Sequence, residues 1–206
     1  MFIRKYNTDG FIQTFKTRLV AKGFTQKEGV DYFDTYSLVA RIISIKVLFT
    51  LASIYTLYVH QMDIKTTFLY EDLKEEVYME QSKGFILPGN KEKVCKLVKS
   101  LYGLKQALKQ WHEKFDKVIF LNGFHHNGSD KCMNSKFTKD SGVIIYLYVD
   151  DMLIFSTNMI GIVETKRYLT SIFKMKYLGE VDRILGIKVK KHSSGYARLI
   201  PHLTLV

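Results

Sequence analysis

The sequence predicts a fold that combines α-helices with β-strands. Residues 142–155, GVIIYLYVDDMLIF, place apolar and β-branched runs on both sides of two adjacent acids, a pattern typical of a β-hairpin with the acids at its turn. Apolar residues recur at helical spacing over 37–59, 108–124 and 162–173. With 206 residues and 47% hydrophobic content, the chain is long enough to bury a core, as one domain or as two closely joined subdomains.

A second hairpin is predicted at the N-terminus. Two extended runs, 2–12 and 14–23, flank the segment Asn7-Thr8-Asp9-Gly10, and Asp-Gly favours the positive φ of a tight turn. Two interpretations remain open. The hairpin grips a triphosphate or a nucleic-acid backbone, or it is an ordinary exposed ribbon whose lysines discourage edge pairing. Its basic residues are Arg4, Lys5, Lys16, Arg18 and Lys22.

The remaining helices and strands are interpreted as structural. Ser37 is available as the N-cap of the first helix, which we expect to belong to the core. Trp111 on the second helix is expected to anchor the core rather than to stack on a base. His125 and His126 have no second pair of ligands at metal spacing, which favours solvated loop histidines. Short strands are expected at 58–64 and 184–189.

The charge balance favours a polyanionic partner. Thirty-one Lys and Arg against twenty Asp and Glu give a formal charge of +11. This suits nucleic acid before an anionic membrane, although a lysine-rich solvated surface explains the same balance. The two cysteines have no CxxC spacing, which argues against a zinc module or a disulfide framework. The chain starts without the apolar core of a signal peptide, and polar residues interrupt its longest apolar run. We therefore expect an intracellular protein that is neither secreted nor in a membrane.

Asp150 and Asp151 form the candidate chemical centre. Nothing basic lies within 142–155 to pair with them. Two neighbouring carboxylates repel each other, and each also loses hydration near an apolar core. Exposure of the turn to solvent is one remedy, and coordination of a divalent cation such as Mg²⁺ is another. Taken by itself the motif favours the exposed turn, so a cation site needs support from other parts of the sequence.

Asp63 is the candidate for a third acid. It lies near the end of the strand expected at 58–64, where an acid is usually a solvated strand end or a helix cap. It is far from Asp150 in the sequence, so the two meet only if the fold brings them together. Three carboxylates on adjacent strands would suit two magnesium ions about 4 Å apart, the arrangement that drives phosphoryl transfer in polymerases.

Six strings in the chain form a recognisable series. They are FKTRLVAKGFTQKEGVDYFDTYSLVAR, QMDIKTTFL, EEVYMEQSKGF, VCKLVKSLYGLKQALKQW, LYVDDMLIF and LGIKVKK. Taken in order, they resemble the reverse transcriptase domain of copia-type retrotransposon polyproteins over almost the whole chain. One such string would be weak support, but six in the family's order and spacing are strong. The YVDD sequence at 148–151 looks like the family's catalytic turn.

The resemblance implies a right-hand polymerase with fingers and palm, an α+β fold built on an antiparallel palm sheet, with the thumb missing. Its implied partners are an RNA or DNA template–primer, dNTPs and the rest of a Pol polyprotein. Its implied location is the cytoplasm, in virus-like particles, or the nucleus. The implied divisions are a reverse transcriptase domain at 1–197, with fingers at about 1–39 and 71–106 and a palm at about 40–70 and 107–192, and a divergent tail at 198–206.

The resemblance also implies which residues act. One magnesium ion lowers the pKa of the primer 3′-hydroxyl and the other clamps the triphosphate, with Mn²⁺ as a substitute. Phe68 matches the bulky residue that blocks a ribose 2′-hydroxyl. The matching positions are Asp63, Asp150 and Asp151 as catalytic and metal-binding acids, Lys5, Lys16, Arg18, Phe68, Gly103 and Gln106 around the nucleotide, and Leu185, Gly186 and Ile187 in the primer grip.

The chain departs from the family at several positions. Leu38 and Leu108 stand where proline is usual, Tyr70-Glu71 where Asn-Gly is usual, and Tyr177 where Asp is usual. Losing turn residues removes preset φ values. The pattern also ends after Ala197, which suggests a fragment of a degenerate element copy. Three hypotheses follow: an RNA-directed DNA polymerase domain, an inactive remnant that binds nucleic acid, and a relic without a partner.

Overall fold

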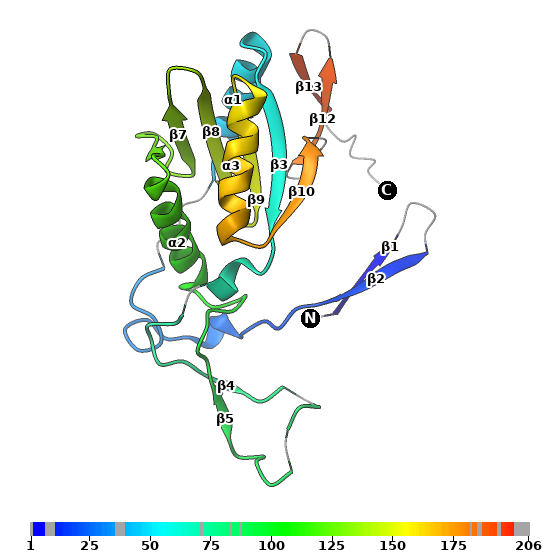
Figure 1. Cartoon of the computed structure of the whole chain (residues 1–206). Coiled ribbons are helices and arrows are strands. Elements are labelled where there is room, and N and C mark those ends of the chain that lie inside the picture. The colour runs from blue at the N-terminus through cyan, green and yellow to red at the C-terminus, as the bar shows by residue number, and fades with distance from the viewer. Residues whose placement is uncertain are drawn as a thin grey trace. The chain divides into compact units, whose positions relative to one another are not determined.

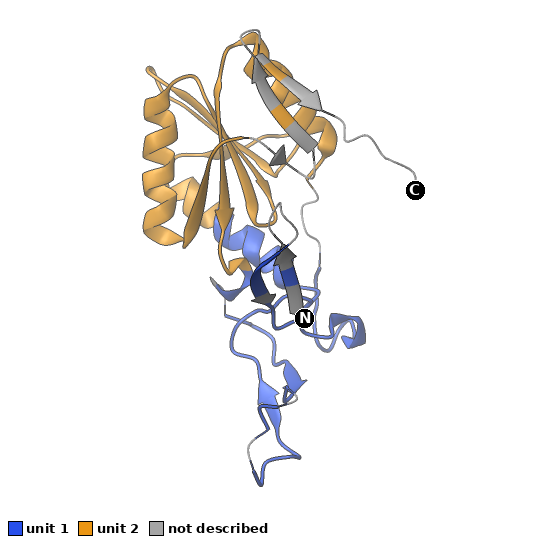
Figure 2. Ribbon diagram, turned by 90° about the vertical axis from the view of Figure 1, so that its right-hand side faces the viewer, with its two compact units in different colours: residues 1–37, 68–115 blue, residues 38–67, 116–206 orange. Residues whose placement is uncertain are grey.

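The chain forms two compact units (Figure 2). Unit 1 comprises Met1–Ser37 and Phe68–Phe115, and unit 2 comprises Leu38–Thr67 and Asp116–Val206. None of the helices in the described residues is long and apolar enough to cross a membrane. The computed structural model describes residues 2–6, 11–35, 40–70, 72–82, 84–86, 88–181, 183–184, 187–192 and 195–199.

Unit 2 is built on a six-stranded antiparallel sheet (Figure 1). The strand order is β10-β3-β9-β8-β7-β6. The hairpin predicted at 142–155 is confirmed, with Asp150 in its turn and Asp151 as the first residue of β9. The strands are β3 (Tyr58–Ile64), β6 (His125–His126), β7 (Met133–Phe137), β8 (Gly142–Tyr148), β9 (Asp151–Ser156) and β10 (Met175–Glu180).

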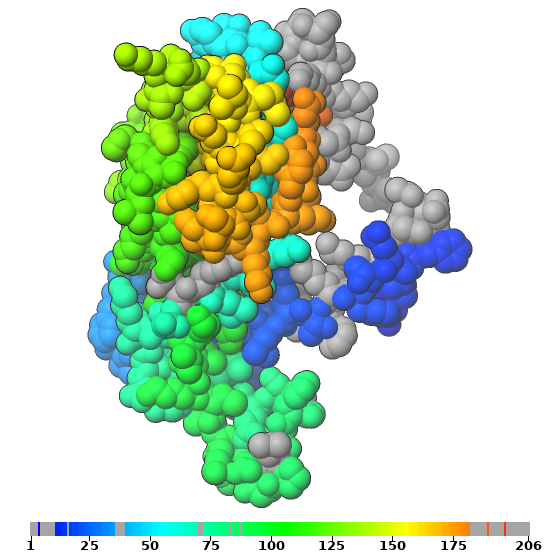
Figure 3. Space-filling view, in the orientation of Figure 1, coloured from blue at the N-terminus to red at the C-terminus, as the bar shows by residue number. Residues whose placement is uncertain are grey.

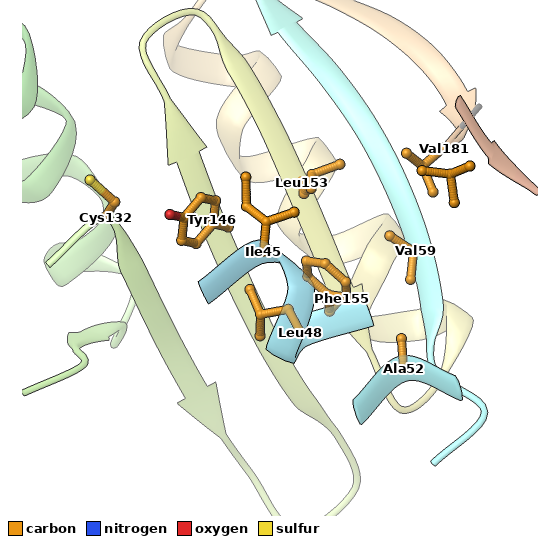
Figure 4. Packing of buried hydrophobic residues seen from close by; sticks show 10 residues of the cluster. Ile45, Leu48, Ala52, Val59, Cys132, Tyr146, Leu153, Phe155 and Val181 are labelled. Atoms are coloured by element: carbon orange, nitrogen blue, oxygen red, sulfur yellow. The ribbon is translucent and has the colours of Figure 1, made fainter. Parts of the chain in front are cut away.

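Two helices cover opposite faces of this sheet. Phe155 of β9 belongs to the buried cluster beneath α1 (Ile42–Ile54). The next residue, Ser156, lies against α3 (Met159–Ile172), so closely that a Cβ on Gly161 would come 2.5 Å from its Oγ. Successive residues of a strand point to opposite faces, so α1 and α3 lie on different sides. Figure 4 shows the cluster on the α1 side, which comprises Ile45, Leu48, Ala52, Val59, Cys132, Tyr146, Leu153, Phe155, Val181 and Val189.

A buried carboxylate, Asp130, ties α1 to the sheet. It accepts hydrogen bonds from Ser44 Oγ at 2.5 Å, from the Tyr146 hydroxyl at 3.3 Å and from the backbone N–H of Cys132 at 3.0 Å. Burial, helped by the charge of Asp130, raises the pKa of the Cys132 thiol to about 12. Cys132 is therefore a buried thiol that stays protonated at neutral pH, whereas Cys95 is exposed.

A three-stranded antiparallel sheet completes the described part of unit 2. It contains β11 (Arg183–Ile184), β12 (Ile187–His192) and β13 (Gly195–Leu199). Tyr196 of β13 packs edge-on against Phe49 of α1, with ring centroids 5.7 Å apart. The strand expected at 184–189 overlaps β12, which begins at Ile187, and residues 185 and 186 of that expectation lie outside the described residues.

Unit 1 contains short ribbons and the first part of a helix. The predicted N-terminal hairpin is confirmed as an antiparallel pair, and its turn, residues 7–10, lies outside the described residues. Trp111 is 1% exposed, so its assignment to the core is confirmed. The elements are β1 (Phe2–Tyr6), β2 (Ile12–Thr17), a 3-10 turn (Gly23–Thr25), a second 3-10 turn that begins in unit 2 (Thr67–Tyr70), β4 (Tyr78–Glu80), β5 (Val94–Lys96) and α2 (Ala107–Leu121), which continues into unit 2.

Two expectations about local structure are wrong. The first helix starts at Ile42, after Arg41 as N-cap, and ends at Ile54, well inside the expected 37–59, because residues from 58 onward pair with β9 as a strand. Ser37, the expected cap, lies outside the described residues. The two adjacent histidines form β6 rather than a loop; His125 is exposed as expected, but His126 is half-buried and its Nε2 lies 3.3 Å from Asp116 Oδ2.

Candidate active site

Asp63 and Asp151 occupy directly opposite positions on β3 and β9. Opposed residues in an antiparallel pair project from the same face, with Cβ atoms about 4.5–5.5 Å apart. Asp63 is four residues from Val59 and Asp151 is four residues from Phe155, and both Val59 and Phe155 belong to the cluster beneath α1. Residues at even spacing along a strand share a face, so both acids project from the α1 face. Two predicted site residues that are distant in sequence are thus brought together.

Asp150 is held beside this pair by the backbone. Its carbonyl oxygen accepts a 2.9 Å hydrogen bond from the N–H of Ile64, the last residue of β3. The preceding residue, Val149, has a φ of 55°, and Thr66, just beyond β3, has a φ of 56°. The left-handed region is unusual for β-branched residues. Strained backbone of this kind concentrates at functional sites, and here it lies next to both acid-bearing segments.

The carboxyl group of Asp151 is in an unfavourable electrostatic position. Partial burial raises its pKa above the ordinary aspartate value, the hydrogen bond from Gln61 lowers it, and the nearby Asp63 raises it, with a net upward shift. Gln61 is buried and donates from Nε2 to Asp151 Oδ1 at 3.3 Å. No motif in the sequence marks Gln61 as a site residue; the only signal for it is the alternation of β3, which puts it on the same face as Asp63.

The facing carboxylates have the chemistry of a hard-cation site. They offer oxygen ligands, they are partly buried and they repel each other, which a divalent cation would relieve. In the part of the chain that the structure describes, no group of three or more His, Cys, Asp or Glu side chains is arranged to hold a metal ion. The oxygen ligands and the mutual repulsion of Asp63 and Asp151 fit a divalent cation at this pair. Convergence of all three carboxylates stays a prediction.

A second group of site residues gathers around Tyr102 in unit 1. The guanidinium carbon of Arg18 lies 4.8 Å from the centroid of the Tyr102 ring. Phe68 packs edge-on against the same ring, with centroids 4.6 Å apart. The sequence predicts Arg18 and Phe68 but not Tyr102, whose only signal is its position in the string LYGLKQ. A guanidinium held on an aromatic ring is a cation with a fixed orientation, suited to an anionic ligand.

Gly103 allows two backbone segments to touch. Its φ is 93°, and a Cβ there would lie 2.2 Å from the carbonyl oxygen of Ala21. The N–H of Ala21 donates to the carbonyl of Tyr102 at 2.7 Å, and Val20 forms a parallel bridge with Tyr102. The segment that carries Arg18 is therefore fixed against the segment that carries Tyr102.

Gln106 has internal partners at both ends of its side chain. It is 1% exposed. Its Nε2 donates to the carbonyl of Asp31 at 3.2 Å, and its Oε1 accepts from Gln26 Nε2 at 3.1 Å. Gln26 Oε1 in turn accepts from the N–H of Lys105 at 2.8 Å. These contacts give Gln106 a structural role, and contact with a nucleotide stays a prediction.

Unit 1 also contains an open groove of about 440 Å³ that the sequence does not predict. Residues 19–22 and 77–82 contribute most of its lining, together with Leu97 and Leu104. Lys22 and Glu80, both well exposed, form an ion pair at 3.5 Å between the two segments. The predicted nucleotide-binding residues do not line this groove.

Several predicted site residues are only partly described. Lys5 lies in β1 and Lys16 in β2, and their side chains fall outside what the structure describes. Leu185 and Gly186 lie outside the described residues. Ile187 is the first residue of β12, described by its backbone alone. The primer-grip assignment and the roles of the two lysines stay predictions.

Comparison with known proteins identifies relatives over nearly the whole chain. The chain is 44% identical over 190 residues to the retrovirus-related Pol polyprotein from transposon TNT 1-94 of Nicotiana tabacum, covering 92% of this chain and 14% of that protein. It is 36% and 33% identical over 195 residues to the corresponding polyproteins from transposons RE1 and RE2 of Arabidopsis thaliana, covering 95% of this chain and 13% of each relative.

A family model agrees with these relatives. The model described as reverse transcriptase (RNA-dependent DNA polymerase) matches residues 1–202. No solved structure matches the chain. Since both comparisons extend over more than nine-tenths of its length, the chain belongs to the reverse transcriptase family of copia-type retrotransposon Pol polyproteins.

Proposed function

We propose that this chain is the fingers-and-palm part of an RNA-directed DNA polymerase, with unit 1 as fingers and unit 2 as palm. The observation that carries the proposal is the register of Asp63 opposite Asp151, because nucleotidyl transfer by two-metal chemistry needs converging carboxylates. The two units also support it, since Met1–Ser37 with Phe68–Phe115, and Leu38–Thr67 with Asp116–Val206, parallel the finger and palm segments that the family resemblance implies.

In this proposal the chemistry belongs to unit 2. Asp63 and Asp151, together with Asp150, would hold Mg²⁺, which lowers the pKa of a primer 3′-hydroxyl and neutralises triphosphate charge when it is bound. Gln61 orients the Asp151 carboxylate through its 3.3 Å hydrogen bond. The bond from Ile64 to the Asp150 carbonyl keeps the turn at the end of β3.

Unit 1 would bind the incoming nucleotide. The forked donors of Arg18 suit phosphate oxygens, and its position on Tyr102 holds them in one orientation. Phe68, supported by the same ring, would exclude a ribose 2′-hydroxyl. Lys5 and Lys16 would add charge from the N-terminal hairpin. The partners proposed are dNTPs, an RNA or DNA template–primer whose phosphates match the charge of +11, and the rest of a Pol polyprotein.

Primer extension tests this proposal. A DNA primer annealed to an RNA template should lengthen with the wild-type chain, dNTPs and Mg²⁺, and should not lengthen with Asp150→Asn or in EDTA. Asp140→Asn removes an equivalent charge from an exposed position between β7 and β8 and should extend like the wild type. Equal extension by the wild type and Asp150→Asn would show that Asp150 is not a catalytic acid.

An inactive remnant that binds nucleic acid is the second candidate. It is favoured by the net charge of +11 and by the lack, among the described residues, of a metal-holding group of three side chains. For this candidate the affinity for a primed template should fall steeply as salt rises, because phosphate contacts release counterions, and no product should form. Affinity that does not change with salt would contradict it.

A further inference from the structure

Three side chains form a row across the sheet of unit 2. β3 has β9 on one side and β10 on the other. Asp63 is the cross-strand partner of Asp151 in β9 and also of Lys176 in β10. The row is therefore Asp151, Asp63, Lys176, with neighbouring Cβ atoms about 4.5–5.5 Å apart.

Lys176 projects from the same face as the two acids. The next residue, Tyr177, has its ring centroid 3.2 Å from Lys166 Nζ of α3 and its hydroxyl 2.6 Å from His60 Nδ1. Tyr177 therefore faces α3, and Lys176 faces the opposite side, where the acids project. β10 lies at the molecular surface beside α3 (Figure 3), and the Lys176 side chain is exposed. Its flexible four-carbon stem lets the ammonium group turn toward Asp63.

We propose that Lys176 is a built-in counter-cation of the Asp63–Asp151 pair and that it weakens the binding of divalent cations there. This inference rests on the proposed function, in which the pair binds Mg²⁺. Two adjacent carboxylates repel each other, and an ammonium group next to one of them relieves part of that repulsion. A divalent cation bound at the pair is then repelled by the ammonium group of Lys176, which lowers its affinity.

The size of the effect follows from Coulomb's law. A unit positive charge about 6 Å from a divalent cation weakens cation binding about tenfold at the dielectric constant of water, and about threefold once physiological salt screens the charges. Removing the charge of Lys176 should therefore tighten cation binding by about 3- to 10-fold, with the larger change at low salt.

Titration of the full chain with Mn²⁺ tests this inference without any need for catalysis. The electron paramagnetic resonance signal of free Mn²⁺ measures binding directly. Lys176→Met should bind Mn²⁺ about 3- to 10-fold more tightly than the wild type, and Lys176→Arg, which keeps the charge, should bind like the wild type. Lys139→Met removes the same net charge from an exposed position between β7 and β8 and should leave the affinity unchanged.

The outcomes separate this inference from the proposed function. Equal or weaker binding by Lys176→Met, or an equal tightening in Lys139→Met, would overturn the role of Lys176. A loss of binding in Asp63→Asn and Asp151→Asn in that same experiment would leave the acid pair standing as the metal site. If those two variants bind like the wild type, both proposals fail. Circular dichroism and urea midpoints check that each variant folds like the wild type. If Lys176→Met folds differently, Lys176→Gln takes its place in the titration.

Discussion

Gly23 and Gly103 lie back to back in unit 1, so close that a Cβ atom on Gly23 would come 1.7 Å from the carbonyl oxygen of Gly103. A side chain at either position would push apart two segments whose backbones touch. One segment leads from Arg18 and the other begins at Tyr102, so this contact sets the distance between the guanidinium and the ring it covers. The two glycines therefore belong to the candidate nucleotide site through the backbone.

Gly103→Ala should destabilise the protein by at least about 3 kcal/mol, because it combines a backbone clash with a left-handed φ. The added methyl group would lie 2.2 Å from the Ala21 carbonyl oxygen. Gly29→Ala is the matched control: φ there is 78° but nothing lies within 4 Å, so about 1–2 kcal/mol of backbone strain is expected. Urea unfolding measures both, and equal losses would mean that the close approach is unimportant.

Gln26 and Gln106 should behave as one unit. Substitution of either residue with Ala breaks the bond between them and leaves a polar atom unpaired on the buried Gln106 or on the half-buried Gln26. Each single change should therefore destabilise the protein by about 1–3 kcal/mol. The double variant should lose less than the sum, with a coupling of about 1 kcal/mol. Urea unfolding of the four proteins gives the cycle. Strict additivity would show that the 3.1 Å bond between the two side chains contributes nothing.

Tyr102→Leu should loosen the nucleotide-binding group of unit 1. It removes the ring that contacts Arg18 and Phe68, and aromatic and cation–π contacts of this kind each contribute about 0.5–1.5 kcal/mol. We expect a stability loss of about 1–3 kcal/mol and a higher KM for dNTPs in primer extension. Tyr102→Phe keeps both ring contacts and should lie near the wild type. If Tyr102→Phe loses as much as Tyr102→Leu, the hydroxyl group rather than the ring is responsible.

Asp151→Asn should stabilise the fold at neutral pH while it abolishes synthesis. The pKa of Asp151 is raised in the folded chain above the ordinary value of 3.8, so the folded state binds the proton more tightly than the unfolded state. Stability from this group is therefore largest at low pH and is lost as the pH rises through the folded-state pKa. At pH 7 the Asn variant should gain up to about 1 kcal/mol.

The gain from Asp151→Asn should shrink as the pH falls from the raised folded-state pKa toward 3.8. It should stay small below 3.8, because the wild-type carboxyl is then protonated in both states. Urea midpoints at several pH values measure it. Asp140→Asn, at an exposed position, is the control and should change little. A gain that stays constant across the pH range would mean that Asp151 ionisation does not limit stability.

The elements that the sequence predicts well are those whose information is local. The hairpin at 142–155 follows from strand composition on both sides of two acids, and α2 and α3 follow from helical spacing; all three are present. The start of α1 was not predictable in the same way. Ile42 follows an N-cap, Arg41, whose side chain makes no capping bond, so tertiary packing rather than a capping residue sets that boundary.

The candidate site also contains residues that local sequence motifs identify and residues that only the tertiary structure brings into place. Asp63, Asp150 and Asp151 can be named from motifs, but the opposition of Asp63 to Asp151 is a matter of register between strands that are distant in sequence. Gln61 and Lys176 owe their places to that register, and no motif marks them. The internal hydrogen bonds of Gln106 depend on Gln26 and Asp31, which lie in a different segment of unit 1.

The contrast between the two thiols makes the natural chain ready for labelling. Cys132 is buried and stays protonated at neutral pH, whereas Cys95 is exposed on the β5 strand that pairs with β4. A maleimide dye should therefore attach at one place, with no engineered substitution. Its fluorescence would report on the β4–β5 ribbon while an oligonucleotide is added, and so provide a reporter for the interaction with nucleic acid.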